Sequence, residues 1–155
     1  SAEKSLEKYG MMWNIDKKTR KKRTEELLSA FGLEEIRKKK MEDLSIGQRR
    51  RVQVAREFMH NMELLFLDEP TVGVDPELRA RIWGHLRQIA DLGTTIVITT
   101  HYIDEASQAD RVGLMRNGSL LAEETPENVM ASQNTTSLEE AFLILCKRQA
   151  KEVIA

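Results

Sequence analysis

The sequence has a single cysteine, Cys146, and this scarcity excludes an intramolecular disulfide. Cysteine-poor chains are typical of reducing compartments, so we expect an intracellular protein. The sequence also has no long apolar stretch, since its longest uninterrupted run covers only residues 141–146. A membrane-spanning helix needs about 20 apolar residues, so no part of these 155 residues is expected to cross a bilayer.

A strong charge of one sign is missing as well. The 24 Lys and Arg residues balance 25 Asp and Glu residues for a net charge of −1, which gives no overall electrostatic reason to bind nucleic acid. A basic run at residues 17–23 is interpreted as a solvated helix face. His60 and His85 have no second ligand at metal spacing and are expected on helix surfaces. The length suits one globular domain.

Residues 64–70 are the stretch around which the rest of the chain is organised. Four apolar residues at 64–67 predict a strand buried on both faces, and Asp68, Glu69 and Pro70 follow it directly. Ligands of open α/β sheets bind at the carboxyl ends of the strands. Two carboxylates at that edge suit a metal-bound phosphate, although an ordinary acidic turn after a strand would use the same residues.

A second strand is predicted at residues 94–100, where every residue is β-branched. Between the two strands, Asp75 is followed by proline and can cap a helix predicted at 77–91. A strand, a helix of this length and another strand form a parallel βαβ unit. Both strands then end at the same edge of the sheet, so Glu69 and His101 are expected to be neighbours.

The N-terminal third consists of charged helical segments without strand signals, predicted at residues 3–13 and 17–31. Ser45 and Gln48 have the spacing of a capping box and begin a further helix. Three arginines at 49–51 occupy its first turn, where the helix dipole disfavours positive charge. A serine hydroxyl, a glycine amide and arginines at a helix N-terminus suit a phosphate group, and an ordinary capped helix is the simpler alternative.

The chain after His101 predicts a short helix and then a two-stranded hairpin. Asn117–Gly118 is the strongest hairpin signal in the sequence, and it separates strands predicted at 111–115 and 119–123. Two further helices follow, and the second is predicted to begin after Ser137.

These elements stand in one order and spacing, because Asp68 lies 20 residues after Gln48 and His101 lies 32 residues after Glu69. In that order they resemble the nucleotide-binding domain of an ABC transporter over residues 3–130. The resemblance implies an α/β fold class: a partial P-loop NTPase (RecA-like) ABC ATPase core with a mostly parallel sheet, plus an N-terminal helical subdomain. The implied domains are 1–60, the helical subdomain ending in the signature helix; 61–125, the C-terminal part of the α/β core; and 126–155, the C-terminal helices.

The resemblance also implies a role for each motif. Leu44–Gln48 resembles the ABC signature, Leu64–Asp68 resembles Walker B, and His101 is similar to the switch histidine. ATP and Mg²⁺ are the implied cofactors. The implied site residues are Asp68 for the metal, Glu69 and His101 for catalysis, and Ser45, Ile46, Gly47, Gln48 and Asp75 for ATP bound across a subunit boundary.

The sequence departs from the family pattern in two places. Ile46 stands where the signature usually has a glycine, and the retained Gly47 preserves close backbone approach. A phosphate-binding loop needs the pattern G-x-x-x-x-G-K-[ST], and none of the eight glycines precedes a lysine. We therefore expect half of a nucleotide-binding domain, inactive toward ATP by itself, whose uncovered strand edges favour self-association.

The stretch Thr71–Pro76 and the long charged helical region look most like ATPases of two-component drug exporters. The implied function is an ATP-hydrolysing subunit that drives export, with a second nucleotide-binding domain and transmembrane permease subunits as partners. The implied location is cytoplasmic, peripheral on the inner face of the cell membrane. Two alternatives stay open: a soluble ABC-type ATPase of DNA repair or translation, and a non-enzymatic truncated module that lends its signature face to a complete partner.

Overall fold

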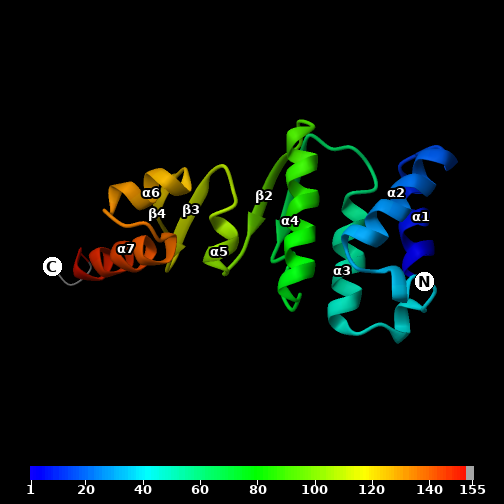
Figure 1. Ribbon diagram of the computed structural model, residues 1–155, viewed down its shortest axis with the longest axis horizontal. Helices are drawn as coiled ribbons and strands as arrows, with labels where there is room; N and C mark the ends of the chain where they lie inside the picture. Colours follow the sequence, from blue (N-terminus) through cyan, green and yellow to red (C-terminus); the bar gives the residue numbers. More distant parts are fainter. Residues whose placement is uncertain (153–155) are drawn as a thin grey trace. The chain divides into compact units, whose positions relative to one another are not determined.

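The computed structural model describes residues 1–152, with side chains described up to residue 150 (Figure 1). Its contacts divide the chain into two compact units, Ser1–Thr99 and a second unit that begins at Thr100. Each unit has a hydrophobic core of its own and is described by itself. The implied boundaries after residues 60 and 125 differ from this division and stay a prediction. The implied segment 126–155 ends in residues 153–155, which lie outside the described residues.

The first part of unit 1 is helical, as predicted. Three helices pack on one another, with α1 against both α2 and α3 (Figure 1). Their bounds are α1 Ala2–Met12, α2 Lys17–Ala30 and α3 Ile46–Glu57, and two short 3-10 turns, η1 Glu34–Ile36 and η2 Met41–Asp43, connect α2 to α3.

Local signals in the sequence explain where these helices begin and how closely they pack. The carboxylate of Asp16 accepts hydrogen bonds from two backbone amides of α2, each 3.0 Å long, and so caps that helix. Gly32 follows α2 at φ +57°, a conformation that favours glycine. At Gly10, helix α1 approaches the turn that follows α3 and the side chain of Arg20 in α2, since an added Cβ would lie 2.7 Å from Cε of Met59 and 2.9 Å from Arg20. The absence of a side chain at Gly10 therefore permits this close contact.

The predicted βαβ unit is confirmed. Strand β1 (Leu64–Asp68), helix α4 (Pro76–Asp91) and strand β2 (Thr95–Thr99) follow one another. The two strands pair in parallel and in register, with Phe66 opposite Val97 at the centre. Both strands therefore end at one edge, at Asp68 and Thr99.

The prediction that the strand at residues 64–67 is buried on both faces is wrong. Leu65 and Leu67 face the core, but Leu64 is 50% and Phe66 is 69% exposed. Strand β2 alternates in the same way between exposed and partly buried residues. Helix α4 packs on the sheet, and no element of residues 1–152 buries the opposite side chains. Apolar side chains on both sides of a strand indicate a covered second face, but they do not reveal whether the cover belongs to the same stretch of chain.

Unit 2 is smaller and carries the predicted hairpin. It comprises α5 (Ile103–Ala106), β3 (Val112–Arg116), β4 (Ser119–Glu124), α6 (Pro126–Ser132) and α7 (Leu138–Glu152). The two strands pair antiparallel.

The turn residues and the apolar pattern explain unit 2. Asn117 and Gly118 both have positive φ, at +49° and +75°, as a type I′ hairpin turn requires. Leu138 and Ala141 of α7 and Val112 of β3 belong to its core. The mostly parallel sheet of the prediction is thus one parallel pair in unit 1 and one antiparallel pair here.

The prediction that His85 lies on a helix surface is wrong. Its ring meets Phe31 and Phe58 edge-on, with centroids 5.9 Å and 5.5 Å apart. Burial lowers the pKa of His85 below the usual histidine value. The residue therefore packs as a neutral aromatic ring between α4 and the helical part of unit 1.

Candidate functional site

The signature-like segment forms the N-terminus of α3. The hydroxyl of Ser45 accepts a hydrogen bond from the amide of Gln48 over 3.2 Å, and the amide of Ser45 donates to Oε1 of Gln48 over 3.0 Å. This reciprocal pair is the predicted capping box. Leu44 is buried and anchors the segment to the core. The segment is therefore fixed to the start of a helix whose remaining amides and dipole favour an anion.

The outer surface of this segment is open. Ile46 is 81% exposed, and an added Cβ at Gly47 would meet no atom within 4 Å. Ser45 is also exposed. Within the described chain nothing covers the segment, so an external ligand or chain can approach it.

Two of the three arginines after the segment tie α3 to its surroundings. Arg50 donates from Nη2 to the backbone oxygen of Asp68 over 2.5 Å. Arg51 donates from Nη1 to the backbone oxygens of Phe31 and Gly32, each 3.3 Å away. The unfavourable placement of arginines at a helix N-terminus is thus offset by hydrogen bonds to carbonyl groups.

The carboxyl end of β1 carries the two acids. Oδ1 of Asp68 accepts a hydrogen bond from the hydroxyl of Thr99, the residue opposite it on β2. The amide of Glu69 donates to the backbone oxygen of Thr99 over 3.0 Å. Glu69 has φ +48°, which is uncommon for a residue other than glycine. Such a conformation costs about 1–3 kcal/mol, so the surrounding structure must hold it in place.

Asp75 begins α4 as predicted. Its Oδ1 accepts a hydrogen bond from the amide of Leu78 over 3.0 Å, and Pro76 is the first helical residue. This backbone hydrogen bond lowers the pKa of Asp75 below its usual range. Gly73 precedes it at φ +71° and makes the turn from the strand to the helix.

His101 belongs to unit 2, two residues beyond the end of β2. Its ring lies against Tyr102, with centroids 4.3 Å apart and planes tilted by 36°. The amide of Tyr102 donates to the hydroxyl of Thr100 over 3.1 Å and orders this turn. The expected contact of His101 with Glu69 crosses the unit boundary and stays a prediction.

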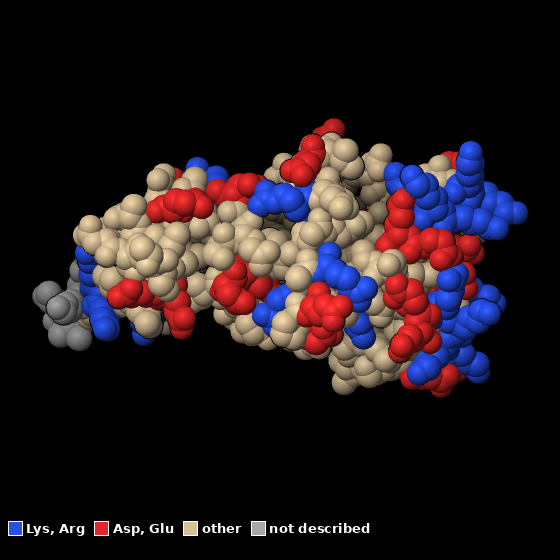
Figure 2. Space-filling view, viewed as in Figure 1, with Lys and Arg blue, Asp and Glu red and all other residues tan. Residues whose placement is uncertain are grey.

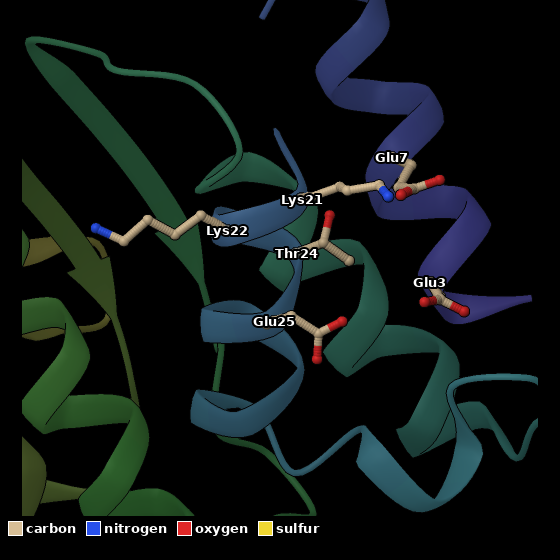
Figure 3. A pocket seen from close by; sticks show the side chains of 6 residues that line it. All are labelled: Glu3, Glu7, Lys21, Lys22, Thr24 and Glu25. Atoms are coloured by element: carbon tan, nitrogen blue, oxygen red, sulfur yellow. The ribbon is translucent and has the colours of Figure 1, made fainter. Parts of the chain in front are cut away.

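Most candidate residues are exposed, whereas Gln48 and Glu69 are partly buried. The cavity in unit 1 lies between α1 and α2, has a volume of about 310 Å³ and contains none of them. Figure 3 shows its charged lining, which comprises Glu3, Glu7, Lys21, Lys22, Thr24 and Glu25. Among the described residues, no group of three or more His, Cys, Asp or Glu side chains could hold a metal ion by itself. In the same part of the chain, no helix is long and apolar enough to span a membrane.

The comparisons with known proteins agree with this arrangement. The chain matches the family model described as ABC transporter over residues 2–72. It is 39% identical over 150 residues to ABC transporter G family member 20 of Dictyostelium discoideum, which covers 97% of this chain and 20% of that protein. It is 35% identical over 159 residues to the linearmycin resistance ATP-binding protein LnrL of Bacillus subtilis. This alignment covers 97% of this chain and 51% of that protein. The chain belongs to the ABC transporter family of ATP-binding proteins.

Further relatives of this ABC protein have drug-resistance names. The daunorubicin/doxorubicin resistance ATP-binding protein DrrA of Streptomyces peucetius is 40% identical over 119 residues, which covers 76% of this chain and 36% of that protein. A solved structure described as an ATP binding subunit of an ABC transporter has a TM-score of 0.81 at 23% identity, covering 94% of this chain and 62% of the other. The fold is therefore α/β, a partial ABC ATPase core with a helical subdomain.

The aligned ABC proteins are much longer than this chain. It spans from 20% to 51% of the length of the curated relatives named above. The activity and the partners of the whole protein are therefore treated below as a proposal.

Sequence reasoning missed two residues of the site. Thr99 could have been found, because an in-register parallel pair places it beside Asp68. Arg50 could not have been selected from three consecutive arginines, since each is equally basic and only the structure shows which one reaches Asp68.

Proposed function

We propose that this chain is part of the ATP-hydrolysing subunit of an ABC exporter of drug-like compounds. The observation that carries the proposal is the joining of two motifs, because Arg50 connects the signature helix α3 to the end of β1 at Asp68. Phosphoryl transfer to water requires positioned charge and an oriented nucleophile. The acids at this edge and the anion-favouring start of α3 are the two kinds of group that this reaction uses.

Asp68 is the proposed Mg²⁺ ligand, and Thr99 orients its carboxylate. The carboxylate of Asp68 is exposed and is oriented by the hydroxyl of Thr99, so it can offer an oxygen outward. Mg²⁺ is usually bound by one or two carboxylates together with substrate phosphates and water, so one presented carboxylate fits this metal. When bound, the ion would neutralise charge on the phosphates of ATP.

Glu69 is the proposed general base. The positive φ at Glu69 turns the chain at the end of β1, and the two acids differ in environment, since Asp68 is exposed and Glu69 is partly buried. One acid can then serve the metal while the other accepts a proton from the attacking water. His101 is the proposed contact of the γ-phosphate, donated by unit 2.

The signature segment is proposed to bind ATP held by a second subunit. Ser45, Ile46, Gly47 and Gln48 form a rigid, uncovered start of α3. An anion at this position would face amides, a hydroxyl and the positive end of the helix dipole. Asp75 is proposed to lie at the same subunit boundary, where one carboxylate oxygen caps α4 and the other is available to a partner.

The proposed partners are a second nucleotide-binding domain and transmembrane permease subunits, at the cytoplasmic face of the cell membrane. The names of the relatives favour export over DNA repair or translation, since they refer to resistance to daunorubicin, doxorubicin and linearmycin. These 155 residues contain no phosphate-binding loop. We therefore expect no saturable ATP binding by this chain alone in calorimetry, and clear saturable binding would contradict that part of the proposal.

The decisive experiment uses the whole protein and compares two matched acids. Glu69→Gln should lower kcat for ATP hydrolysis by about 100-fold or more, while the exposed Glu63→Gln should change it by less than about twofold. Both substitutions remove one negative charge near β1, so a general charge effect would appear in both. Undiminished hydrolysis by the Glu69→Gln protein would rule out the proposed base.

A further inference from the structure

Three neighbouring apolar side chains at the junction of α1 and α2 are exposed. Met11 is 58%, Met12 is 74% and Trp13 is 52% exposed. The Trp13 ring stacks on His60 with centroids 3.9 Å apart and planes only 8° from parallel. We define residues 11–18 as the α1–α2 tip. Its indole is held in one orientation by the stack, although about half of its surface remains open to solvent.

The tip is surrounded by positive charges that form no ion pair with a described acidic residue. Lys17 and Lys18 are exposed, and neither forms an ion pair with any described residue. Arg20 donates to the backbone oxygen of Ile15 over 2.8 Å. Arg23 donates to a backbone oxygen and to an asparagine amide oxygen. Because these acceptors are uncharged, the single negative charge of Asp16 within the tip offsets only part of the four positive charges, and the region remains net positive.

The placement of the lysines costs stability. Lys17 and Lys18 are the first two residues of α2, where the helix dipole disfavours positive charge, and the first turn has no acid. Asp16 is the one acid of the tip, and its carboxylate is already used to cap α2. Figure 2 shows Lys and Arg side chains gathered over this end of α1 and α2. The arrangement disfavours the isolated helix but suits an external surface of negative charge.

We propose that the α1–α2 tip binds directly to the surface of a bilayer that contains anionic phospholipids. Trp13 and the two methionines would enter the interfacial region, and the surrounding cations would lie among the phosphate headgroups. Tryptophan is enriched at membrane interfaces, and clusters of lysine and arginine residues near the membrane are typical of binding sites for anionic lipids. The contact requires neither nucleotide nor permease subunits, so it goes beyond the proposed function and can fail separately from it.

The composition of the tip favours a lipid surface over an acidic protein. Lysine is depleted at protein interfaces, whereas flexible lysine stems suit fluid headgroups without fixed geometry. A stable protein complex buries about 1,200–2,000 Å² of total surface, far more than three side chains provide. A membrane needs no shape complementarity, and a modest apolar insertion combined with basic residues gives reversible attachment. An acidic protein partner is retained as an outcome of the test.

The test measures sedimentation of the full chain, without nucleotide, with vesicles of phosphatidylglycerol and phosphatidylcholine. Binding should increase with the phosphatidylglycerol fraction and decrease as salt screens the charges. Each lysine near an anionic surface contributes about fivefold in partitioning, so K17E/K18E should lower binding by about 25-fold or more. The matched control is K38E/K39E, which changes the charge equally at two other exposed lysines and should leave most binding intact.

Insertion of Trp13 has its own readout. Phospholipids brominated on their acyl chains should quench part of the tryptophan fluorescence, and Trp13→Phe should abolish the quenching because the remaining Trp83 is only 9% exposed. Leu92→Ala is the apolar control, since Leu92 is 86% exposed and lies outside the tip. Circular dichroism of each variant establishes that it is folded.

Three results would overturn the proposal: no sedimentation with phosphatidylglycerol vesicles, equal sedimentation with pure phosphatidylcholine, or equal losses for K17E/K18E and K38E/K39E. Binding to polyglutamate without binding to vesicles would assign the tip to an acidic protein and would also overturn it. ATP hydrolysis by the whole protein is measured in parallel. Loss of vesicle binding with normal hydrolysis would remove this proposal and leave the proposed function standing.

Discussion

Arg50 reaches from the first turn of α3 to the end of β1, where its Nη2 atom donates to the backbone oxygen of Asp68 over 2.5 Å. The two residues are 18 positions apart in the sequence. The bond connects the signature helix to the strand that carries both acids. A shift of α3 relative to β1 would therefore be transmitted to the backbone beside Glu69.

The first prediction concerns this bond. Arg50→Ala should lower the free energy of unfolding by about 1–2 kcal/mol, because a hydrogen bond from a charged donor to a carbonyl group is lost at a partly solvated site. Urea denaturation followed by circular dichroism measures the change. Arg49→Ala is the matched control, since Arg49 is exposed and forms no hydrogen bond with a described residue, and it should change stability by less than about 0.5 kcal/mol. Equal effects of the two substitutions would contradict the assigned role of Arg50.

The second prediction compares two helical glycines. Gly84 lies in α4 and is exposed, and an added Cβ there meets no atom within 4 Å. Gly84→Ala should raise the free energy of unfolding by about 0.5–1 kcal/mol, because alanine has the higher helix propensity. Gly10→Ala should lower it, since its Cβ would lie 2.7 Å from Cε of the buried Met59 and 2.9 Å from Arg20. Thermal melting of both variants tests the opposite signs, and stabilisation by Gly10→Ala would mean that the side chains of Met59 and Arg20 move away from α1 at little cost.

The third prediction concerns pH. Burial holds the pKa of His85 below its usual value, so the folded state favours the neutral ring more than the unfolded state does. The contribution of His85 to stability is therefore complete above the unfolded pKa of about 6.5 and is lost as the pH falls from there toward the folded pKa. His85→Phe keeps an aromatic ring beside Phe31 and Phe58 and should flatten the loss of stability with acidification in this range.

His60 provides the comparison for this experiment. Burial lowers its pKa as well, so it should produce the part of the pH dependence that the His85→Phe protein retains. Urea midpoints at several pH values, for the single variants and for the double variant His60→Gln/His85→Phe, separate the two contributions. An unchanged pH dependence in the double variant would show that other groups determine the acid sensitivity.

The fourth prediction is self-association through the sheet of unit 1. Phe66 is 69% exposed, and within residues 1–152 strand β1 pairs with β2 alone. An uncovered apolar face beside an unpaired strand edge favours contact between copies. Sedimentation velocity of the chain should give an average mass that rises above 17.8 kDa with concentration. Phe66→Ser should reduce this rise, and Leu92→Ser, which also removes a large exposed side chain, should not. A monodisperse monomer at high concentration would refute the prediction.

Much of the fold could be predicted because its signals are local. The capping residues Asp16, Ser45 and Asp75 each define a helix start within one turn of chain, and Asn117–Gly118 defines the hairpin through its own dihedral angles. These features depend on neighbouring residues alone. The βαβ unit followed from the lengths of its parts, because a parallel connection requires a crossover.

The errors concern what lies against each element. Phe66 was expected to be buried and is exposed. His85 was expected to be exposed and packs on phenylalanine side chains. An apolar pattern records which faces can be buried, whereas the neighbour that buries them is determined by tertiary contacts. Among the candidate site residues, the positions at strand and helix ends follow from local structure. The link from Arg50 to Asp68 depends on where the tertiary fold places α3 relative to the end of β1.

Within residues 1–152, the sheet of unit 1 consists of β1 and β2 alone, and this has a consequence for the exchange of amide protons with solvent. Backbone amides of a strand point alternately to its two sides, and the amide of Glu69 points to β2, where it meets the oxygen of Thr99. The amides of Leu65 and Leu67 therefore face β2 as well, while those of Phe66 and Asp68 face the unpaired edge. Deuterium should enter β1 at every second residue, and a chain segment that later pairs with this edge would slow exchange at Leu64, Phe66 and Asp68 but not at Leu65 and Leu67.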